Sequence, residues 1–171
     1  MLAGAFACTP TGPHYPYPLA AFVKMGLGPL DRPHRDLDRC LRDLAEAVRA
    51  RDVALVRGRA CLLVEKLGEH FVDEEEMMRA TGWPHLARHA ECHAHLLTQA
   101  RRFERHVAVN SLTPDIASWA LNRLPELLRF HMIATDFGFA KHAVRVTRSP
   151  APRLARLRDP RTPIPPLRPD R

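Results

Sequence analysis

Apolar residues in the middle of the chain recur every three or four positions, which is the spacing of one face of an α-helix. Asp52 can cap the start of the second stripe, and Gly82 stands at its end, where helices commonly stop. With short connections between the stripes, we expect an all-α fold, an antiparallel up-down four-helix bundle. The four predicted helices cover residues 31–50, 53–82, 83–107 and 116–146.

Three prolines fall inside these predicted helices, and Pro84 lies in the opening turn of the third one. Pro33 lies in the opening turn of the first one, where the missing N–H group costs nothing. Pro125 lies well inside the fourth one, and we expect it to kink that helix.

The segments that flank the predicted bundle are rich in proline. Residues 1–29, which include Pro10, Pro13, Pro16 and Pro18, are expected to form an extended arm, and residues 30–147 are expected to form the bundle. The last 23 residues carry seven prolines, so we predict that the segment 148–171 is a disordered tail. The chain has 171 residues, of which 46% are apolar and 26% charged, and this suits a single globular domain.

The formal charge of +7 is concentrated in the tail. Six arginines and two aspartates lie between Ser149 and the end, so the tail carries +4 of the total. The bundle itself is only weakly basic, and we do not expect nucleic acid as a partner. A protein partner that binds through the tail stays open, and the sequence does not indicate the oligomeric state.

The four cysteines are far apart and form no C-x-x-C motif, so we expect reduced thiols and a cytoplasmic location. The opening MLAGAFACTP lacks the positive charge and the length of a secretory signal. No apolar run is long enough to span a bilayer, so membrane insertion is not expected. The cysteines are Cys8, Cys40, Cys61 and Cys92.

Each of the four apolar stripes contains at least one imidazole. A single histidine in such a row is more often a core residue than a metal ligand, but here the pattern repeats in every helix. Two pairs have the i,i+4 spacing that places both side chains on one helix face. The residues are His34, His70, Glu74, His89, His93, His131 and Asp136.

Asp136 does not follow from spacing alone, because five residues from His131 correspond to a rotation of about 140° in a regular helix. The energetics favour a metal all the same. A lone ionised carboxylate in a bundle core is strongly disfavoured, and a bound cation removes that penalty. Imidazole and carboxylate together suit Fe, Zn, Mn or Cu, and this ligand set exceeds the needs of one ion. Two ions bridged by the carboxylates would use it fully.

Four short motifs resemble the hemerythrin family, and in particular the bacterial hemerythrins. They are HRDL at 34–37, HFVDEE at 70–75, HAECH at 89–93 and HMIATD at 131–136. The resemblance covers about residues 30–142 and implies a non-heme centre of two iron ions that binds O2. As a set the motifs are specific, although H-x-x-x-H alone is weak.

By that resemblance, three histidines would hold one iron and two would hold the other, with both carboxylates bridging. The first iron would be held by His89, His93 and His131, and the second, where O2 would bind, by His34 and His70. Glu74 and Asp136 would be the bridges. Leu128, Met132 and Phe71 would line the O2 pocket, with Phe130 as a further wall residue.

Other polar residues near these motifs have simpler interpretations. We expect Glu69, Asp73, Glu75 and Glu76 to face water, and His85, His95 and His106 to lie off the ligand stripe. The predicted function is O2 storage, delivery or sensing rather than catalysis, because no acid or base is evident beyond the ligands. The alternatives are an enzyme that acts on peroxide or nitric oxide at the same site, or a signalling module.

Overall fold

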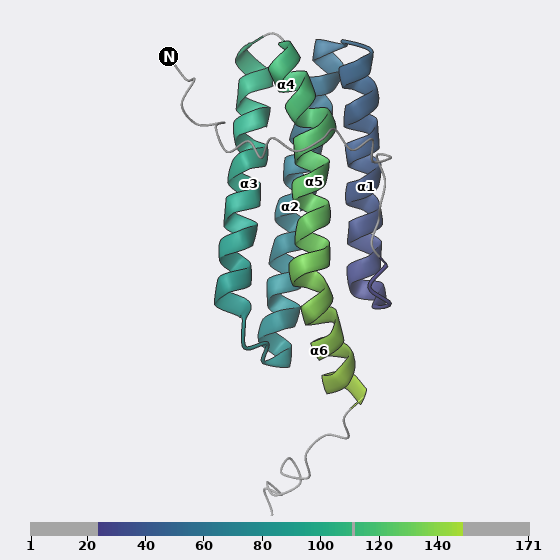
Figure 1. Ribbon diagram of the computed structural model, residues 1–171, viewed down its shortest axis with the longest axis vertical. Helices are drawn as coiled ribbons and strands as arrows, with labels where there is room; N and C mark the ends of the chain where they lie inside the picture. The colour runs from purple at the N-terminus through teal and green to yellow at the C-terminus, as the bar shows by residue number, and fades with distance from the viewer. Residues whose placement is uncertain (1–23, 111, 149–171) are drawn as a thin grey trace, which may run out of the picture.

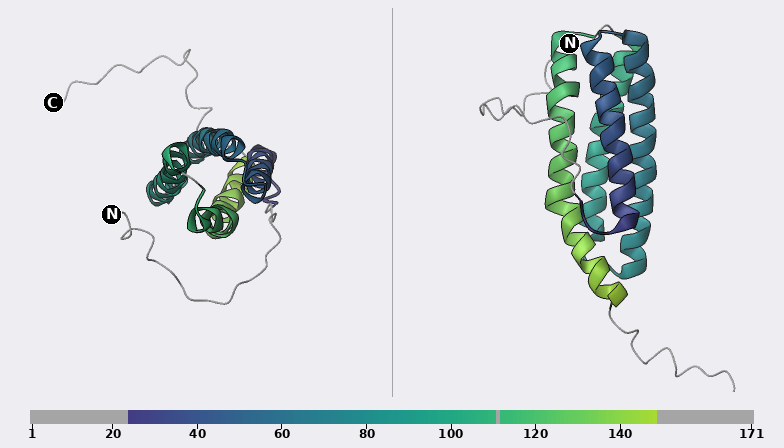
Figure 2. Two further views of the ribbon diagram at one scale, coloured as in Figure 1. Left: turned by 90° about the horizontal axis from the view of Figure 1, so that it is seen from above. Right: turned by 90° about the vertical axis from the view of Figure 1, so that its right-hand side faces the viewer.

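A computed structural model describes residues 24–110 and 112–148 of the chain, and these form four helical rods that run alternately up and down (Figure 1). Three rods are single helices: α1 is Gly28–Arg49, α2 is Val53–Thr81 and α3 is Leu86–Val109. Seen from above, the four rods surround one shared interior (Figure 2). The predicted all-α bundle is confirmed, and the described residues contain no strand. The predicted arm and tail lie outside the described residues, apart from their inner edges.

The helix ends follow the local signals in the sequence. The Asp52 carboxylate accepts a hydrogen bond of 2.9 Å from the Leu55 N–H group and so caps α2. Gly82 ends α2 with φ 65°, in the left-handed region that glycine adopts at no steric cost. At the start of α1, the buried Asp31 accepts a hydrogen bond of 2.6 Å from the Met25 N–H group, which ties the preceding residues to the bundle.

The fourth rod is one continuous helix that widens twice. It begins with α4 and ends with α6, and each of its two π turns contains a hydrogen bond that reaches five residues back. Leu124 donates to the Trp119 carbonyl, and Phe137 donates to the Met132 carbonyl. The first widened turn lies directly before Pro125, whose missing N–H group would have broken a regular helix at this point. The segments are α4 Pro114–Ser118, η1 Trp119–Arg123, α5 Leu124–His131, η2 Met132–Asp136 and α6 Phe137–Arg148.

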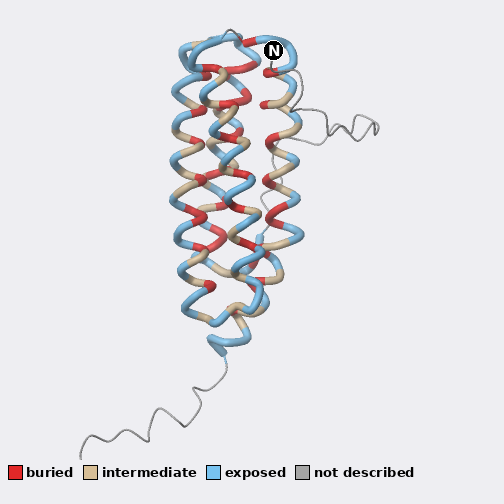
Figure 3. The backbone as a smooth tube through the Cα atoms, turned by 90° about the vertical axis from the view of Figure 1, so that its left-hand side faces the viewer, coloured by how far each residue is buried: buried red, intermediate tan, exposed pale blue. Residues whose placement is uncertain are grey.

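The buried residues form a line along the inner side of each rod (Figure 3). Apolar layers fill the end where α1 joins α2, and the predicted ligand residues fill the middle of the other half. Below them the interior closes with apolar side chains, among them Leu30, Met78 and Phe139, each fully buried. The three-and-four spacing of the apolar stripe predicts that Met77 faces inward; Met77 is half-buried and packs against the core, whereas the adjacent Met78 is fully buried. Four residues separate Met78 from Glu74, which keeps both on the inner face.

Among the described residues, no helix combines the length and the apolar character needed to cross a membrane. The three described cysteines, Cys40, Cys61 and Cys92, are all unpaired thiols.

Candidate metal centre

The structure brings all seven predicted ligand residues together in the bundle interior. Every rod contributes, since α1 supplies one residue, α2 and α3 supply two each, and the fourth rod supplies two. All seven side chains belong to residues that are at most 5% exposed. They are His34, His70, Glu74, His89, His93, His131 and Asp136.

The five imidazoles converge through the same ring atom, Nε2. The Nε2 atoms of His34 and His70 lie 3.2 Å apart, which joins α1 to α2. The Nε2 atoms of His89 and His93 lie 2.9 Å apart on α3. His131 places its Nε2 3.0 Å from Asp136 Oδ1. Five ring nitrogens that face one another and the carboxylates form a donor set that is compact enough for metal ions.

The donor atoms separate into two groups that share one carboxylate. Within each group, one atom from every residue lies within 4.8 Å of all the others. Glu74 also faces both groups, because its Oε2 lies 3.6 Å from His70 Nε2 and 3.3 Å from His93 Nε2. The larger group is Glu74, His89, His93, His131 and Asp136, and the smaller is His34, His70 and Asp136.

The second π turn explains how Asp136 reaches the cluster. In a regular helix Asp136 would point about 140° away from His131. The turn Met132–Asp136 contains one extra residue, so the fifth residue falls back toward the face of the first. Asp136 is fully buried as a result, and its Oδ2 lies 3.3 Å from His34 Nε2 on α1. A local irregularity of the helix thus places the shared carboxylate.

Two residues outside the predicted ligand set hold the imidazoles in place. Glu75 accepts a hydrogen bond of 2.8 Å from His93 Nδ1, so the prediction that Glu75 simply faces water is wrong. The Thr135 hydroxyl donates to the His131 carbonyl at 2.5 Å and accepts from His131 Nδ1 at 3.0 Å. With the proton held on Nδ1, the Nε2 lone pair of each ring is free to bind a metal. The i,i+4 spacing of Thr135 from His131 was the available signal.

Apolar side chains of α2 and of the fourth rod lie beside the cluster. The Phe71 ring stacks on the His93 ring with centroids 4.0 Å apart and lies edge-on to His131 at 5.9 Å. Leu128 and Met132, one turn before and one residue after His131, are both buried. That these three residues line an O2 pocket stays a prediction. Phe130 does not contribute a wall, since it is 71% exposed on the outer face.

Charge pairing dominates the electrostatics of the metal-free cluster. Burial alone would raise the pKa of Glu74, but the His89 and His93 imidazoles beside it lower that pKa to about 2. Asp136 likewise has a pKa well below its usual value, despite burial, because of His131, His34 and His89. Burial lowers the pKa of His70 to about 4. His89 has its pKa raised to about 9, because its two carboxylate neighbours outweigh the effect of burial.

Several individual atoms of this buried cluster still lack a hydrogen-bond partner. Within the described residues, no hydrogen-bond partner is found for either oxygen of Glu74, for Asp136 Oδ2 or for His131 Nε2. Buried polar atoms in proteins are almost always paired, and a dry ionised carboxylate is costly. Cations placed among these atoms would satisfy all of them at once. The donor set therefore fits metal ions that take mixed nitrogen and oxygen ligands.

The remaining histidines of the described chain lie away from this cluster. His85 and His95 are exposed on the outer side of their rod, as predicted. His106 is half-buried near the far end of α3, and His142 donates a hydrogen bond of 2.9 Å to the Thr81 carbonyl.

Comparison with known protein families agrees with this geometry. Residues 25–143 match the family model described as Hemerythrin HHE cation binding domain. The match covers more than half of the chain and includes all seven residues of the cluster. A search of curated proteins finds no match.

Proposed function

The chain belongs to the hemerythrin family of HHE cation-binding domains, and on this basis we propose that it holds two iron ions and binds O2 reversibly. His89, His93 and His131 would hold one iron, and His34 and His70 the other. Glu74 and Asp136 would each bind both irons. The observation that carries the proposal is the division of the donor atoms into two groups that share Asp136.

The unequal size of the two groups supports an O2 site on one side. The group of His34, His70 and Asp136 consists of two imidazoles and one carboxylate. This ligand set is typical of non-heme Fe(II) sites that keep open coordination positions. The other group, with three imidazoles and two carboxylates, is nearly complete. When bound, the iron pair would supply the electrons and the vacant position that O2 needs.

The protein's own contribution is to hold the ligands rigidly and to keep water out. Glu75 and Thr135 fix the rings of His93 and His131 through Nδ1, so neither ring can rotate its Nε2 away. The Phe71 ring covers one face of the His93 ring. A rigid and dry site favours reversible binding, because water and protons promote irreversible oxidation of the metal.

Iron analysis and stopped-flow O2 binding test the proposal directly. The purified protein should contain about two irons per chain, and the reduced protein should bind O2 with a colour change that argon reverses. The variant His34→Leu should lose the O2 response, whereas His95→Leu on the exposed face should retain it. Folded protein from iron-rich cells that contains no iron would refute the proposal.

The same experiment separates carriage from the alternatives. Sustained turnover of peroxide or nitric oxide, with rapid irreversible oxidation under O2, would indicate an enzyme. An unchanged O2 response combined with an altered cellular response after removal of residues 149–171 would indicate a signalling module. The cytoplasmic location stays a prediction, which fractionation of the producing cell would test.

A further inference from the structure

The two donor groups of the metal centre differ in how firmly the protein holds their ligands. In the larger group, Glu75 accepts a hydrogen bond of 2.8 Å from His93 Nδ1. In the same group, Thr135 accepts a hydrogen bond of 3.0 Å from His131 Nδ1. In the smaller group, His34 is fully buried, and no partner for its Nδ1 is found within residues 24–110 and 112–148. The protein therefore supports two rings of the larger group in a way that it does not support His34.

The missing partner of His34 matters most when a metal binds. Its Nε2 is the atom that faces the cluster, 3.2 Å from His70 Nε2 and 3.3 Å from Asp136 Oδ2. A neutral imidazole that binds a metal through Nε2 carries its proton on Nδ1. At His34 this N–H group would be buried without an acceptor, which is costly. Metal binding at His34 therefore creates an unpaired donor, and this happens at neither His93 nor His131.

The two carboxylates also favour the larger group. Glu74 and Asp136 both belong to it, whereas only Asp136 belongs to the smaller group. Glu74 Oε2 is also nearer to the larger group, at 3.3 Å from His93 Nε2 and 3.6 Å from His70 Nε2. A cation in the larger group would thus face two negative charges at short range. Once bound, it would offset the charge on the shared Asp136 and repel a second cation.

We propose that the two donor groups fill in a fixed order, with the larger group first and the smaller group only at a much higher metal concentration. This inference rests on the proposed function, because it concerns the same pair of ions. A missing hydrogen bond behind a ligand weakens metal binding about tenfold to a hundredfold, and the smaller number of ligands adds to that difference. The two dissociation constants should therefore differ by at least about a hundredfold. Between the two steps, the chain contains iron but lacks the ion at the proposed O2 site.

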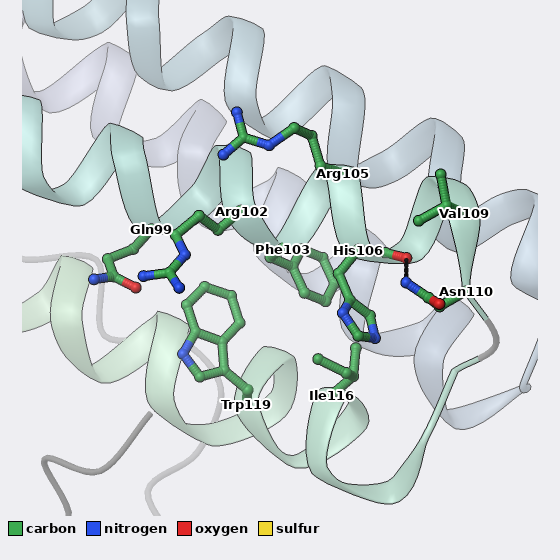
Figure 4. Close-up of a pocket in the computed structure, with 9 residues that line it drawn as sticks. All are labelled: Gln99, Arg102, Phe103, Arg105, His106, Val109, Asn110, Ile116 and Trp119. Atoms are coloured by element: carbon green, nitrogen blue, oxygen red, sulfur yellow. Dashed lines mark hydrogen bonds between the residues drawn. The ribbon is translucent and has the colours of Figure 1, made fainter. Parts of the chain in front are cut away.

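The part of the chain that the structure describes offers no third donor group that would obscure this order. A hollow of about 360 Å³ lies between α3 and the start of the fourth rod, away from the cluster (Figure 4). The hollow contains His106, but none of its nine lining residues is a carboxylate or a cysteine. Among the described residues, only the two groups of the metal centre bring three or more metal-binding side chains together. We therefore expect two binding steps from the bundle.

A zinc titration of the metal-free protein tests the order without any oxygen chemistry. Zn2+ accepts the same nitrogen and oxygen ligands and does not change its oxidation state. Calorimetry in the presence of a competing chelator should show two steps of one ion per chain each, with dissociation constants at least about a hundredfold apart. A single step that takes up two ions together, or no uptake at all, would overturn the proposal.

Iron release then connects the order to the proposed function. Reduced, iron-loaded protein under argon should lose one iron per chain at a chelator concentration that leaves the other in place. The O2 response should disappear with the first iron that leaves. An O2 response that persists with one iron per chain would overturn the order. Loss of both irons together would do the same while leaving reversible O2 binding intact, whereas protein that takes up no iron would refute the proposed function and leave the zinc titration as the test of the order.

Histidine variants show which group fills first. His34→Leu should keep the tighter zinc step and lose the weaker one, and the retained step shows that the bundle is folded. His95→Leu, on the exposed face of α3, is the matched control and should keep both steps. Loss of both steps in His34→Leu, or loss of the tighter one, would overturn the proposal.

A variant behind the larger group checks the physical reason for the order. Glu75→Leu removes the acceptor of His93 Nδ1, so the tighter step should weaken about tenfold or more and the weaker step less than threefold. The two steps should therefore move toward each other. Glu75→Gln keeps an acceptor and should recover part of the loss, whereas Glu76→Leu, on the exposed face, should change neither step. A Glu75→Leu variant that weakens only the second step would contradict the assignment of the larger group to the first step.

Discussion

Two halves of the same bundle interior are equally buried and opposite in chemistry. The apolar half consists of Leu44, Val48, Val56, Phe103, Val107 and Ile116, all nearly inaccessible to water. The histidine half consists of the seven residues of the metal centre, which are at most 5% exposed. Both halves are built from the same four rods, so helix geometry alone does not distinguish them.

The difference lies in what each half needs in order to be stable. Apolar side chains stabilise the fold by leaving water, at about 25 cal/mol for each Å² buried. Imidazoles and carboxylates lose the free energy of hydration when they are buried, and only hydrogen bonds, ion pairs or metal bonds compensate for that loss. In the histidine half several of these partners are absent from the described protein atoms. We therefore expect the apolar half to hold the bundle together and the histidine half to depend on metal.

The largest effect should follow from removal of a shared carboxylate. Glu74→Ala takes away an oxygen that faces both donor groups and leaves a cavity, so stable binding of two metals should be lost. Metal analysis of the purified variant measures this. Glu76→Ala, on the exposed face two residues later, is the matched control and should bind metal normally. Two irons retained in Glu74→Ala would mean that this carboxylate does not bridge.

A core substitution in the apolar half should reduce stability without touching the metal. Leu44→Ala should lower the free energy of unfolding by about 2–5 kcal/mol, because Leu44 is 1% exposed and would leave a cavity. Urea denaturation measures the loss, and the iron content should remain at its normal value. Leu55→Ala, where the side chain is 43% exposed, should cost far less. A drop in iron content in Leu44→Ala would show that the two halves are not independent.

Acid should weaken the metal-free protein through the histidine half. The pKa of His70 in the folded protein is about 4, below its ordinary value of 6.5. Between pH 6.5 and 4, His70 is therefore protonated in the unfolded chain but largely neutral in the folded protein. The His70 contribution is present above pH 6.5 and is lost as the pH falls toward 4. Between pH 6.5 and 4.5 the free energy of unfolding should fall by about 2 kcal/mol.

Urea denaturation of the metal-free protein at several pH values measures this slope. His70→Leu should flatten it, whereas His95→Leu on the exposed face should not. His89 does not oppose the trend in this interval, because its raised pKa stabilises the fold below 6.5 and loses effect only as the pH rises through 9. A slope that is unchanged in His70→Leu would be evidence against the assignment.

The smallest expected effect concerns a residue that touches a ligand but not the metal. Glu75→Gln keeps an oxygen that can accept from His93 Nδ1 but removes the charge, so metal affinity should fall about tenfold. Competition with a chelator measures the affinity, and Glu76→Gln is the control. Equal affinities for the two variants would show that Glu75 does not support the ligand.

The sequence predicted the bundle and the inward-facing residues, because both depend on a period of 3.6 residues. His70 and Glu74, like His89 and His93, share a face in any regular helix, and in the structure the polar atoms of each pair lie close together. Met77 and Met78 show the limit of that reasoning, since adjacent apolar residues can exchange places on the inner face. Phe130 was misplaced for a similar reason, because it is next to His131 and therefore points elsewhere.

Features that depend on contacts between helices could not be read from spacing. Asp136 came from the resemblance to the hemerythrin motifs, and the widened turn that places it leaves no clear mark in the sequence. Glu75 lay in a run of acids, and only the position of α3 selects it over Glu76 as the partner of His93. The spacing of Thr135 from His131 permitted their contact, but which ring nitrogen carries the proton, and so whether Thr135 accepts, is not visible in the sequence.

The widened turn Met132–Asp136 also fixes the phase of everything that follows it. Because the turn contains one extra residue, the side chains of α6 are rotated about the helix axis by about 100° relative to an uninterrupted helix. Phe139, Ala140 and Ala143 face the interior only with that offset. Deletion of one residue in this turn would therefore remove that rotation and turn the apolar stripe of α6 toward water.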